Sequence, residues 1–351
     1  MREALFYEKL SNNKVRCNLC GHRCVIHDSK NGVCGVRKNI TGQLYTLNYG
    51  KLISQHIDPI EKKPLYHFYP GSKAYSIATA GCNFKCGNCQ NYHISQLSER
   101  ENRIEGEMVT PEEVVVQAVE YSCKSIAYTY TEPTIFYEFA LDVAKLAHQK
   151  GLKNIFITNG YITPEALQTI APYLDAANVD LKSFSKKFYH SNCKAKMQPV
   201  LDTLKLLKKL GIWFEVTTLV IPTLNDSNEQ LQAIAEFIIG LGKEIPWHIS
   251  AFYPAYQLKD IPPTPRRLLY RAWEIGLNFG LHYVYIDNID TTEFTTTHCH
   301  NCGRSLIRRK FYVIVKNCIS NTRCPFCSAV VAGILLDSER ESDQYDISTT
   351  I

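Results

Sequence analysis

Residues 75–89, YSIATAGCNFKCGNC, combine a strand signal with a metal-ligand loop, and they decide how the chain folds. The first six residues form a short, mostly apolar run, as expected for a strand of a parallel sheet that is covered on both faces. Cys82, Cys86 and Cys89 follow in a Cys-x3-Cys-x2-Cys loop. Three thiolates can bind three irons of a four-iron cluster and leave the fourth open, and chemistry requires such an open position. The alternative is a zinc site with a distant fourth ligand such as His93.

Beyond this loop the chain alternates apolar runs with helical patterns. Thr110-Pro111 begins one helix with a capping signal, and Gly151 and Gly211 end two others. Strand and helix repeat about every 30 residues, which predicts βαβ units and a parallel sheet. Six units form an incomplete barrel or a doubly wound sheet, with functional residues at the carboxyl ends of the strands. The further strands are expected at residues 125–130, 154–159, 177–183, 213–221 and 247–253.

Cysteine is the most informative count, at 14 of 351 residues, and most of these lie in three tight groups. The amino terminus lacks the apolar core of a secretory signal, and no run of about 18 apolar residues predicts a membrane span. We therefore expect the cytoplasm, where thiols stay reduced and clustered cysteines bind metal. The net charge of +5 does not by itself indicate a nucleic-acid partner.

The third cysteine group predicts a small metal-binding module near the carboxyl end. Cys299-x2-Cys302 and Cys324-x2-Cys327 are two knuckles typical of a zinc ribbon, with rubredoxin-like iron as the alternative.

The first cysteine group offers four thiolates in a Cys-x2-Cys-x3-Cys-x9-Cys pattern. Structural zinc is the first interpretation, and an auxiliary iron–sulfur cluster is the second. Cys123, Cys193 and Cys318 have no partner at a ligand spacing and are interpreted as incidental. The four ligands are Cys17, Cys20, Cys24 and Cys34, with His22 or His27 as substitutes.

These groups divide the chain into four expected parts. They are an N-terminal cysteine-rich module at 1–70, a core at 71–290, a ribbon-like module at 291–336 and a flexible tail at 337–351.

Five runs of sequence carry a resemblance to a known family. The central loop and the strand ends that follow it resemble the radical S-adenosylmethionine (SAM) superfamily, and within it the pyruvate formate-lyase activating enzymes. More narrowly, the chain is similar to the AmmeMemoRadiSam system radical SAM enzymes, over nearly its whole length to about Leu336. The runs are CNLCGHRC (17–24), GVCGVR (32–37), DPIEKKPLYHFYPGS (58–72), GCNFKCGNCQNYHISQ (81–96) and TYTEPTIFYE (129–138).

The resemblance implies a partial (β/α)6 TIM-like barrel and radical chemistry. A reduced [4Fe-4S] cluster on the three central cysteines would hold the amino and carboxylate groups of S-adenosylmethionine on its free iron. One electron from an external one-electron reductant would then break the bond from sulfur to the 5′ carbon, and the adenosyl radical would take a hydrogen from the substrate. The cofactor supplies the radical, and the protein supplies orientation and excludes water.

The resemblance also implies a cradle for S-adenosylmethionine at the strand ends. Thr131 and Glu132 match part of a Gly-Gly-Glu-Pro-like turn that faces the cofactor's amino group, although the glycines are absent. Asn159 is placed to reach the ribose or carboxylate. Asp180 and Lys182 share one face by strand alternation, and Lys182 would pair with the cofactor carboxylate. Read without the resemblance, an isolated surface ion pair is an equally good interpretation.

The adenine contacts are less well specified. His248 is a candidate, although a lone strand histidine is commonly structural. Asn88 stands where many relatives have an aromatic residue, so stacking on adenine would fall to Tyr92 or Phe84.

The substrate is open to several interpretations. Similarity to glycyl-radical activators implies hydrogen abstraction from a protein or peptide. Basic runs such as RRLLYR (266–271) and SLIRRKF (305–311) leave RNA as an alternative, beside a small metabolite. A non-enzymatic alternative is a zinc-rich adaptor in which all three cysteine groups are structural.

Overall fold

The computed structural model describes residues 1–96 and 104–335. Its core is a nine-stranded sheet in the order β15-β14-β13-β12-β11-β10-β8-β7-β9. The strands from β8 to β15 in this order are parallel to their neighbours. They are β8 (Lys73–Thr79), β10 (Ser125–Tyr128), β11 (Lys153–Thr158), β12 (Ala176–Asp180), β13 (Trp213–Val220), β14 (Trp247–Ala251) and β15 (Val284–Asp287).

The strand order identifies the fold as a partial barrel. The parallel strands follow one another in chain order without reversal, and right-handed crossovers then place the connecting helices on one side of the sheet. A doubly wound sheet would instead reverse its order partway. The predicted partial barrel is therefore confirmed, and the sheet is open because β15 does not pair with β9 at its other edge.

The number of strands differs from the prediction of six. The seventh parallel strand, β15, has four residues and pairs with β14. Its run is too short to display a period, and it closely follows the last long helix, so local pattern did not separate it from a loop.

The helices begin and end where the sequence signals predict. Thr110 caps α3 through a capping box with Glu113, and Gly211 ends α7 with a left-handed φ of 71°. Within the described ranges, no helix is both long and apolar enough to cross a bilayer. Among the described residues, the α-helices of at least four residues are α1 (Tyr92–Ser95), α3 (Pro111–Glu120), α4 (Tyr137–Gln149), α5 (Pro164–Ile170), α7 (Gln198–Leu210), α8 (Asn228–Leu241) and α9 (Arg266–Asn278).

The N-terminal module is smaller than expected. Strand β7 (Lys51–Pro59), which we placed in that module, pairs antiparallel with β8 and so belongs to the core sheet. Its outer neighbour is β9 (Glu107–Met108). Two three-stranded sheets form the module itself. Their strands are β1 (Arg2–Glu3), β5 (Arg37–Ile40) and β6 (Gln43–Thr46), and β2 (Tyr7–Lys9), β3 (Val15–Cys17) and β4 (Val25–Ile26).

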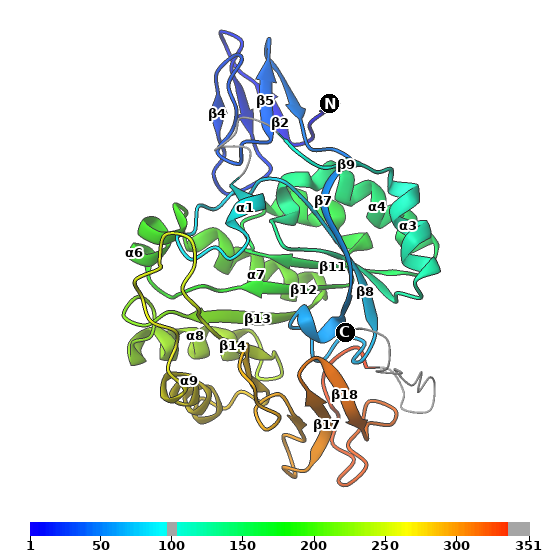
Figure 1. Ribbon diagram of the computed structural model, residues 1–351, viewed down its shortest axis with the longest axis vertical. Helices are drawn as coiled ribbons and strands as arrows, with labels where there is room; N and C mark the ends of the chain where they lie inside the picture. Colours follow the sequence, from blue (N-terminus) through cyan, green and yellow to red (C-terminus); the bar gives the residue numbers. More distant parts are fainter. Residues whose placement is uncertain (97–103, 336–351) are drawn as a thin grey trace.

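The C-terminal ribbon is a three-stranded sheet of β16 (Thr297–His298), β17 (Ser305–Lys310) and β18 (Val313–Asn317). Its buried Arg309 donates to the backbone oxygen of Tyr66 at 2.8 Å and fixes the ribbon to the core. In Figure 1 the ribbon and the N-terminal sheets lie at opposite ends of the core. The predicted tail at 337–351 lies outside the described residues.

Candidate active site and metal centres

An open cavity of about 340 Å³ lies at the carboxyl ends of the core strands. The Cys-x3-Cys-x2-Cys loop forms one wall, and the ends of successive strands form the others. This is the edge at which parallel α/β folds place their functional groups. Its lining includes all three loop cysteines and five predicted cofactor residues, Thr131, Glu132, Asn159, Asp180 and Lys182.

The cysteine loop is held by backbone hydrogen bonds from distant segments. The Lys85 N–H donates to the carbonyl of Cys193 at 3.0 Å, and the Gly87 N–H donates to that of Asn192 at 3.2 Å. The Gln257 N–H donates in turn to the Gly87 carbonyl at 2.9 Å. Asn192 and Cys193 belong to a π-helical turn, Tyr189–Cys193. Sequence reasoning missed this turn, because it has no period or spacing that would single it out.

The sequence interpretation of Cys193 as incidental overlooked its contact with the cysteine loop. Its thiol hydrogen-bonds to that of Cys86, and this contact lowers the pKa of Cys86. Burial raises the pKa of Cys82 well above its usual range, so metal binding at the loop must release a proton there. The Phe84 N–H lies 3.4 Å from the Cys82 sulfur, and Ser95 Oγ lies 3.3 Å from that of Cys89.

Glu132 organises the turn after β10 instead of projecting freely into the cavity. Its Oε1 accepts hydrogen bonds from the Thr134 hydroxyl at 2.6 Å and the Thr158 hydroxyl at 2.8 Å. Its Oε2 accepts from the Asn159 N–H at 2.8 Å. The Thr131 hydroxyl donates to the Thr79 carbonyl at 2.9 Å. The buried carboxylate therefore ties the ends of β10 and β11 together.

Tyr130 takes the backbone conformation for which the missing glycines are suited. Its φ is 59°, in the left-handed region. Its carbonyl accepts a hydrogen bond from Asn91 Nδ2 at 2.9 Å, and its hydroxyl donates to Asp58. The tyrosine side chain thus anchors this turn through Asp58.

Asn159 connects the end of β11 to the cysteine loop. Its Nδ2 donates to Asn83 Oδ1 at 2.7 Å and lies 4.0 Å from the Cys82 sulfur. Asn159 is therefore placed between the thiols and the rest of the cavity.

Asp180 and Lys182 form the ion pair that strand alternation predicts, with 2.7 Å between Lys182 Nζ and Asp180 Oδ2. Burial opposes the charge on Lys182, but the Asp180 carboxylate outweighs it and raises the pKa of Lys182 well above its usual range. Because the pair lines the cavity, it is not the isolated surface ion pair of the alternative interpretation.

His248 is not brought to the cavity. It is fully buried, and its ring nitrogens each lie 2.7 Å from a carboxylate oxygen, of Asp287 on one side and Glu215 on the other. Burial opposes protonation, but the two carboxylates prevail and raise the pKa of His248 to about 9. An adenine contact from this side chain conflicts with that placement, because both polar atoms already have partners.

The aromatic candidates for adenine differ in position. Phe84 lines the cavity, as does Asn88, whose Oδ1 accepts from Asn192 Nδ2 at 2.8 Å. Tyr92 instead stacks on Tyr256 with 4.7 Å between ring centroids.

Two lysines of the cavity wall were not predicted. Lys62 and Lys63 both donate to Asp58, at 2.8 and 2.6 Å. Burial lowers the pKa of Lys63 to about 8. The run DPIEKKP (58–64) was visible in the sequence, but its place beside the strand ends depends on the pairing of β7 with β8.

The four ribbon cysteines converge on one point. Among the described residues, they are the group of three or more potential metal ligands whose ligand atoms all lie within 4.8 Å of one another. Sulfur atoms of Cys299 and Cys327 are 3.5 Å apart, and those of Cys302 and Cys324 are 3.7 Å apart. Thiolates bound at about 2.3 Å around one tetrahedral ion have such spacings.

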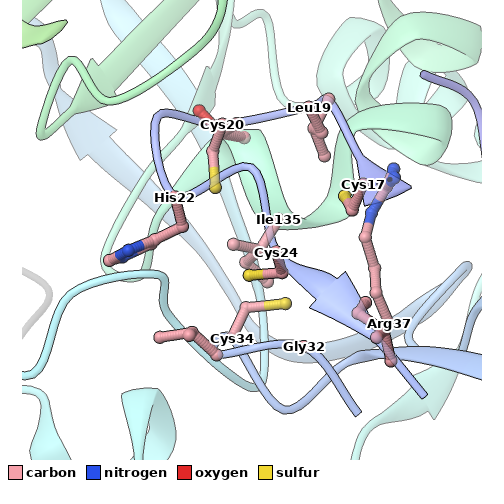
Figure 2. Close-up of a pocket in the computed structure, with 12 residues that line it drawn as sticks. Cys17, Leu19, Cys20, His22, Cys24, Gly32, Cys34, Arg37 and Ile135 are labelled. Carbon is pink, nitrogen blue, oxygen red and sulfur yellow. Dashed lines mark hydrogen bonds between the residues drawn. The ribbon is translucent and has the colours of Figure 1, made fainter. Parts of the chain in front are cut away.

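The four N-terminal cysteines line a separate small cavity of about 20 Å³ (Figure 2). Arg37 lies beside them, with its Nη1 3.6 Å from the Cys17 sulfur. The second Nη of this buried arginine donates to the buried carboxylate of Glu138. The four expected ligands therefore line one cavity, and their binding of a metal stays a prediction.

Comparisons with known proteins agree on one family. The Radical SAM superfamily model matches residues 76–238. An uncharacterized protein of Methanocaldococcus jannaschii is 47% identical over 95% of this chain and 100% of its own length. A putative glycyl-radical enzyme activating enzyme of the same organism is 25% identical, over 59% of this chain and 78% of the relative.

More distant relatives are of the same kind. The pyruvate formate-lyase-activating enzyme of Clostridium pasteurianum is 23% identical over 45% of this chain and 66% of its own length. Among solved structures, Streptococcus suis SuiB bound to S-adenosylmethionine matches with a TM-score of 0.49 and 14% identity, over 65% of this chain and 53% of that one. With its three-cysteine loop, its partial barrel, the superfamily match and the curated activating-enzyme relatives, the chain is an enzyme that belongs to the radical SAM superfamily.

Proposed function

We propose that the protein cleaves S-adenosylmethionine reductively at a [4Fe-4S] cluster on Cys82, Cys86 and Cys89, and uses the resulting radical to abstract hydrogen from a protein or peptide. One observation carries this proposal: three thiols share a cavity with the carboxyl ends of the core strands. A [4Fe-4S] cluster held by these three cysteines would supply the electron that splits the sulfonium. Three thiolates suit it because they leave one iron for the cofactor.

The chain's own residues bind and orient the cofactor. Lys182 is held by Asp180 at the cavity wall and offers a cation to the cofactor carboxylate. Asn159 lies between the thiols and the strand ends and offers an amide to the carboxylate or ribose. Glu132 and Thr131 are positioning residues, since their side-chain oxygens hold the turn whose backbone carbonyls face the cofactor's amino group.

The relatives support a macromolecular substrate. Two of them are named as activating enzymes, one for glycyl-radical enzymes and one for pyruvate formate-lyase, and those targets are proteins. The cavity is open, as entry of a peptide segment requires. The exposed Lys62 at its wall offers a contact to a carboxylate of such a segment.

The ribbon cysteines are proposed to hold Zn²⁺ in a structural role. Four thiolates close the coordination sphere and leave no position for substrate. The spacing of their sulfur atoms suits a single ion.

The cleavage proposal is tested by product formation. Anaerobically reconstituted protein with dithionite and S-adenosylmethionine should form 5′-deoxyadenosine, and Cys86→Ala should abolish the product. Cys123→Ala is the matched control, because Cys123 is buried outside the cysteine groups and should not affect it. Equal product from Cys86→Ala and wild type would refute the cluster assignment. Deuterium transfer into 5′-deoxyadenosine from labelled peptides would then identify the substrate.

A further inference from the structure

The N-terminal cysteines differ from the ribbon cysteines in how far apart their sulfur atoms lie. In the ribbon all four sulfurs are within 4.8 Å of one another. Within the described part of the chain, no three of the N-terminal cysteines meet that criterion, although all four line one small cavity of about 20 Å³. Figure 2 shows their side chains spread around this space.

This spacing separates two kinds of metal centre. Zinc draws its four thiolates to about 2.3 Å, so that their sulfurs lie within about 4 Å of one another. An iron–sulfur cluster distributes its ligands over several irons, so its cysteine sulfurs stand farther apart. The central cysteine set, in which we place a cluster, likewise does not meet the 4.8 Å criterion. The wide N-terminal set around an interior space therefore suits a cluster better than the zinc ion we first expected.

The N-terminal cavity adjoins the cysteine loop of the active site. A Cβ built on Gly81 would lie 3.1 Å from the Cys34 carbonyl oxygen, so the backbone next to Cys82 packs against the backbone of Cys34. His22 Nε2 lies 2.7 Å from the carbonyl oxygen of Asn83, within the loop. The Gly21 N–H donates to the Tyr161 carbonyl at 2.9 Å and anchors the module beyond the end of β11.

We propose that Cys17, Cys20, Cys24 and Cys34 bind a second iron–sulfur cluster, closed by four thiolates, that passes electrons to the cluster of the active site. A closed site suits electron transfer, because it offers no open iron for chemistry. Three of the four cysteines are partly exposed, so an external donor can approach the centre. The buried Arg37 beside Cys17 offsets the negative charge of the thiolates.

Transfer of one electron between the two clusters forms and breaks no covalent bond. An external one-electron reductant reduces the second cluster by one electron, and that cluster is reoxidised when it reduces the active-site cluster. The electron is then consumed in cleavage of one S-adenosylmethionine. This electron transfer from the second cluster to the active-site cluster, the relay, rests on the proposed function, whereas the presence of the second cluster does not.

The cluster itself is tested in a protein that lacks the active-site ligands. The full-length triple variant Cys82→Ala/Cys86→Ala/Cys89→Ala, reconstituted anaerobically, should keep iron and sulfide and give an EPR signal that S-adenosylmethionine does not change. Adding Cys20→Ser and Cys24→Ser should remove that iron, and adding Cys318→Ser instead should not. A triple variant without iron, or with two zinc ions per chain, would overturn the proposal.

The relay is tested by rapid-freeze EPR with reduced flavodoxin as the donor. Cys20→Ser/Cys24→Ser should slow reduction of the active-site cluster several-fold relative to Cys318→Ser. Dithionite reaches the active-site cluster directly, and with it the double variant should still form 5′-deoxyadenosine. Equal reduction rates would refute the relay. Loss of 5′-deoxyadenosine from wild type with dithionite would instead count against the proposed function.

Discussion

At the residue scale, Lys182 joins a sequence pattern to a chemical role. It lines the cavity with its ammonium 2.7 Å from Asp180, and a charged hydrogen bond to the cofactor carboxylate is worth about 1.5–3 kcal/mol. Lys182→Met should therefore weaken S-adenosylmethionine binding by about 10- to 100-fold in equilibrium dialysis, with unchanged iron content. The exposed Lys187→Met is the control. Equal dissociation constants for the two variants would remove Lys182 from the site.

Residue types and spacings predicted much of the site, but not its long-range contacts. Cys82, Cys86 and Lys182 line the same cavity. They could be predicted because strand alternation and a short ligand spacing are local properties of the chain. The contact of Cys193 with Cys86 joins residues more than a hundred positions apart through a π-helical turn. The pairing of His248 with Asp287 depends likewise on the neighbouring strands β14 and β15. Local pattern carries no information on either.

At the element scale, the end of β11 depends on a glycine. Gly160 has a φ of 69°, and a Cβ there would lie 2.9 Å from Val179 Cγ1. Gly160→Ala should lower the free energy of unfolding by about 1–3 kcal/mol, as overpacking does, and should weaken S-adenosylmethionine binding by displacing Asn159. Urea unfolding and equilibrium dialysis measure the two effects.

The matched control is Gly240→Ala in α8, where a Cβ meets no atom within 4 Å. This helical substitution should stabilise by about 0.5–1 kcal/mol. A Gly160→Ala protein as stable as wild type, with unchanged affinity, would show that β11 does not set the position of Asn159.

Elements with strong local signals were predicted, and elements that depend on partners were not. The capping box of α3 and the glycine end of α7 follow from a few adjacent residues. Strand β7, KLISQHIDP, is mixed in polarity, and only its pairing with β8 assigns it to the core. The choice between barrel and doubly wound sheet required the strand order, which spacing does not contain.

At the scale of the whole molecule, a buried network joins distant strands. His248 lies between Glu215 and Asp287, and Glu215 also accepts from the His67 N–H at 2.8 Å. The pKa of His248 rises from 6.5 to about 9 on folding. Protonated His248 therefore stabilises the folded protein fully below pH 6.5, and this stabilisation is lost as the pH rises through 9. Its loss should cost about 3 kcal/mol of unfolding free energy.

The measurement is urea unfolding of wild type and His248→Gln at pH 6.5 and 9. Between these pH values wild type should lose about 3 kcal/mol more unfolding free energy than the variant, because glutamine does not titrate and the other titrating groups are common to both proteins. An identical pH dependence in the two proteins would show that His248 is not the titrating group.

The central claim is that the three loop thiolates leave one iron open to S-adenosylmethionine. The most direct measurement is EPR of the reduced, anaerobically reconstituted protein with and without S-adenosylmethionine, in the Cys20→Ser/Cys24→Ser background to isolate the active-site cluster. We expect a [4Fe-4S]⁺ signal whose g values change when S-adenosylmethionine is added. A cluster signal that is identical with and without S-adenosylmethionine would contradict the account.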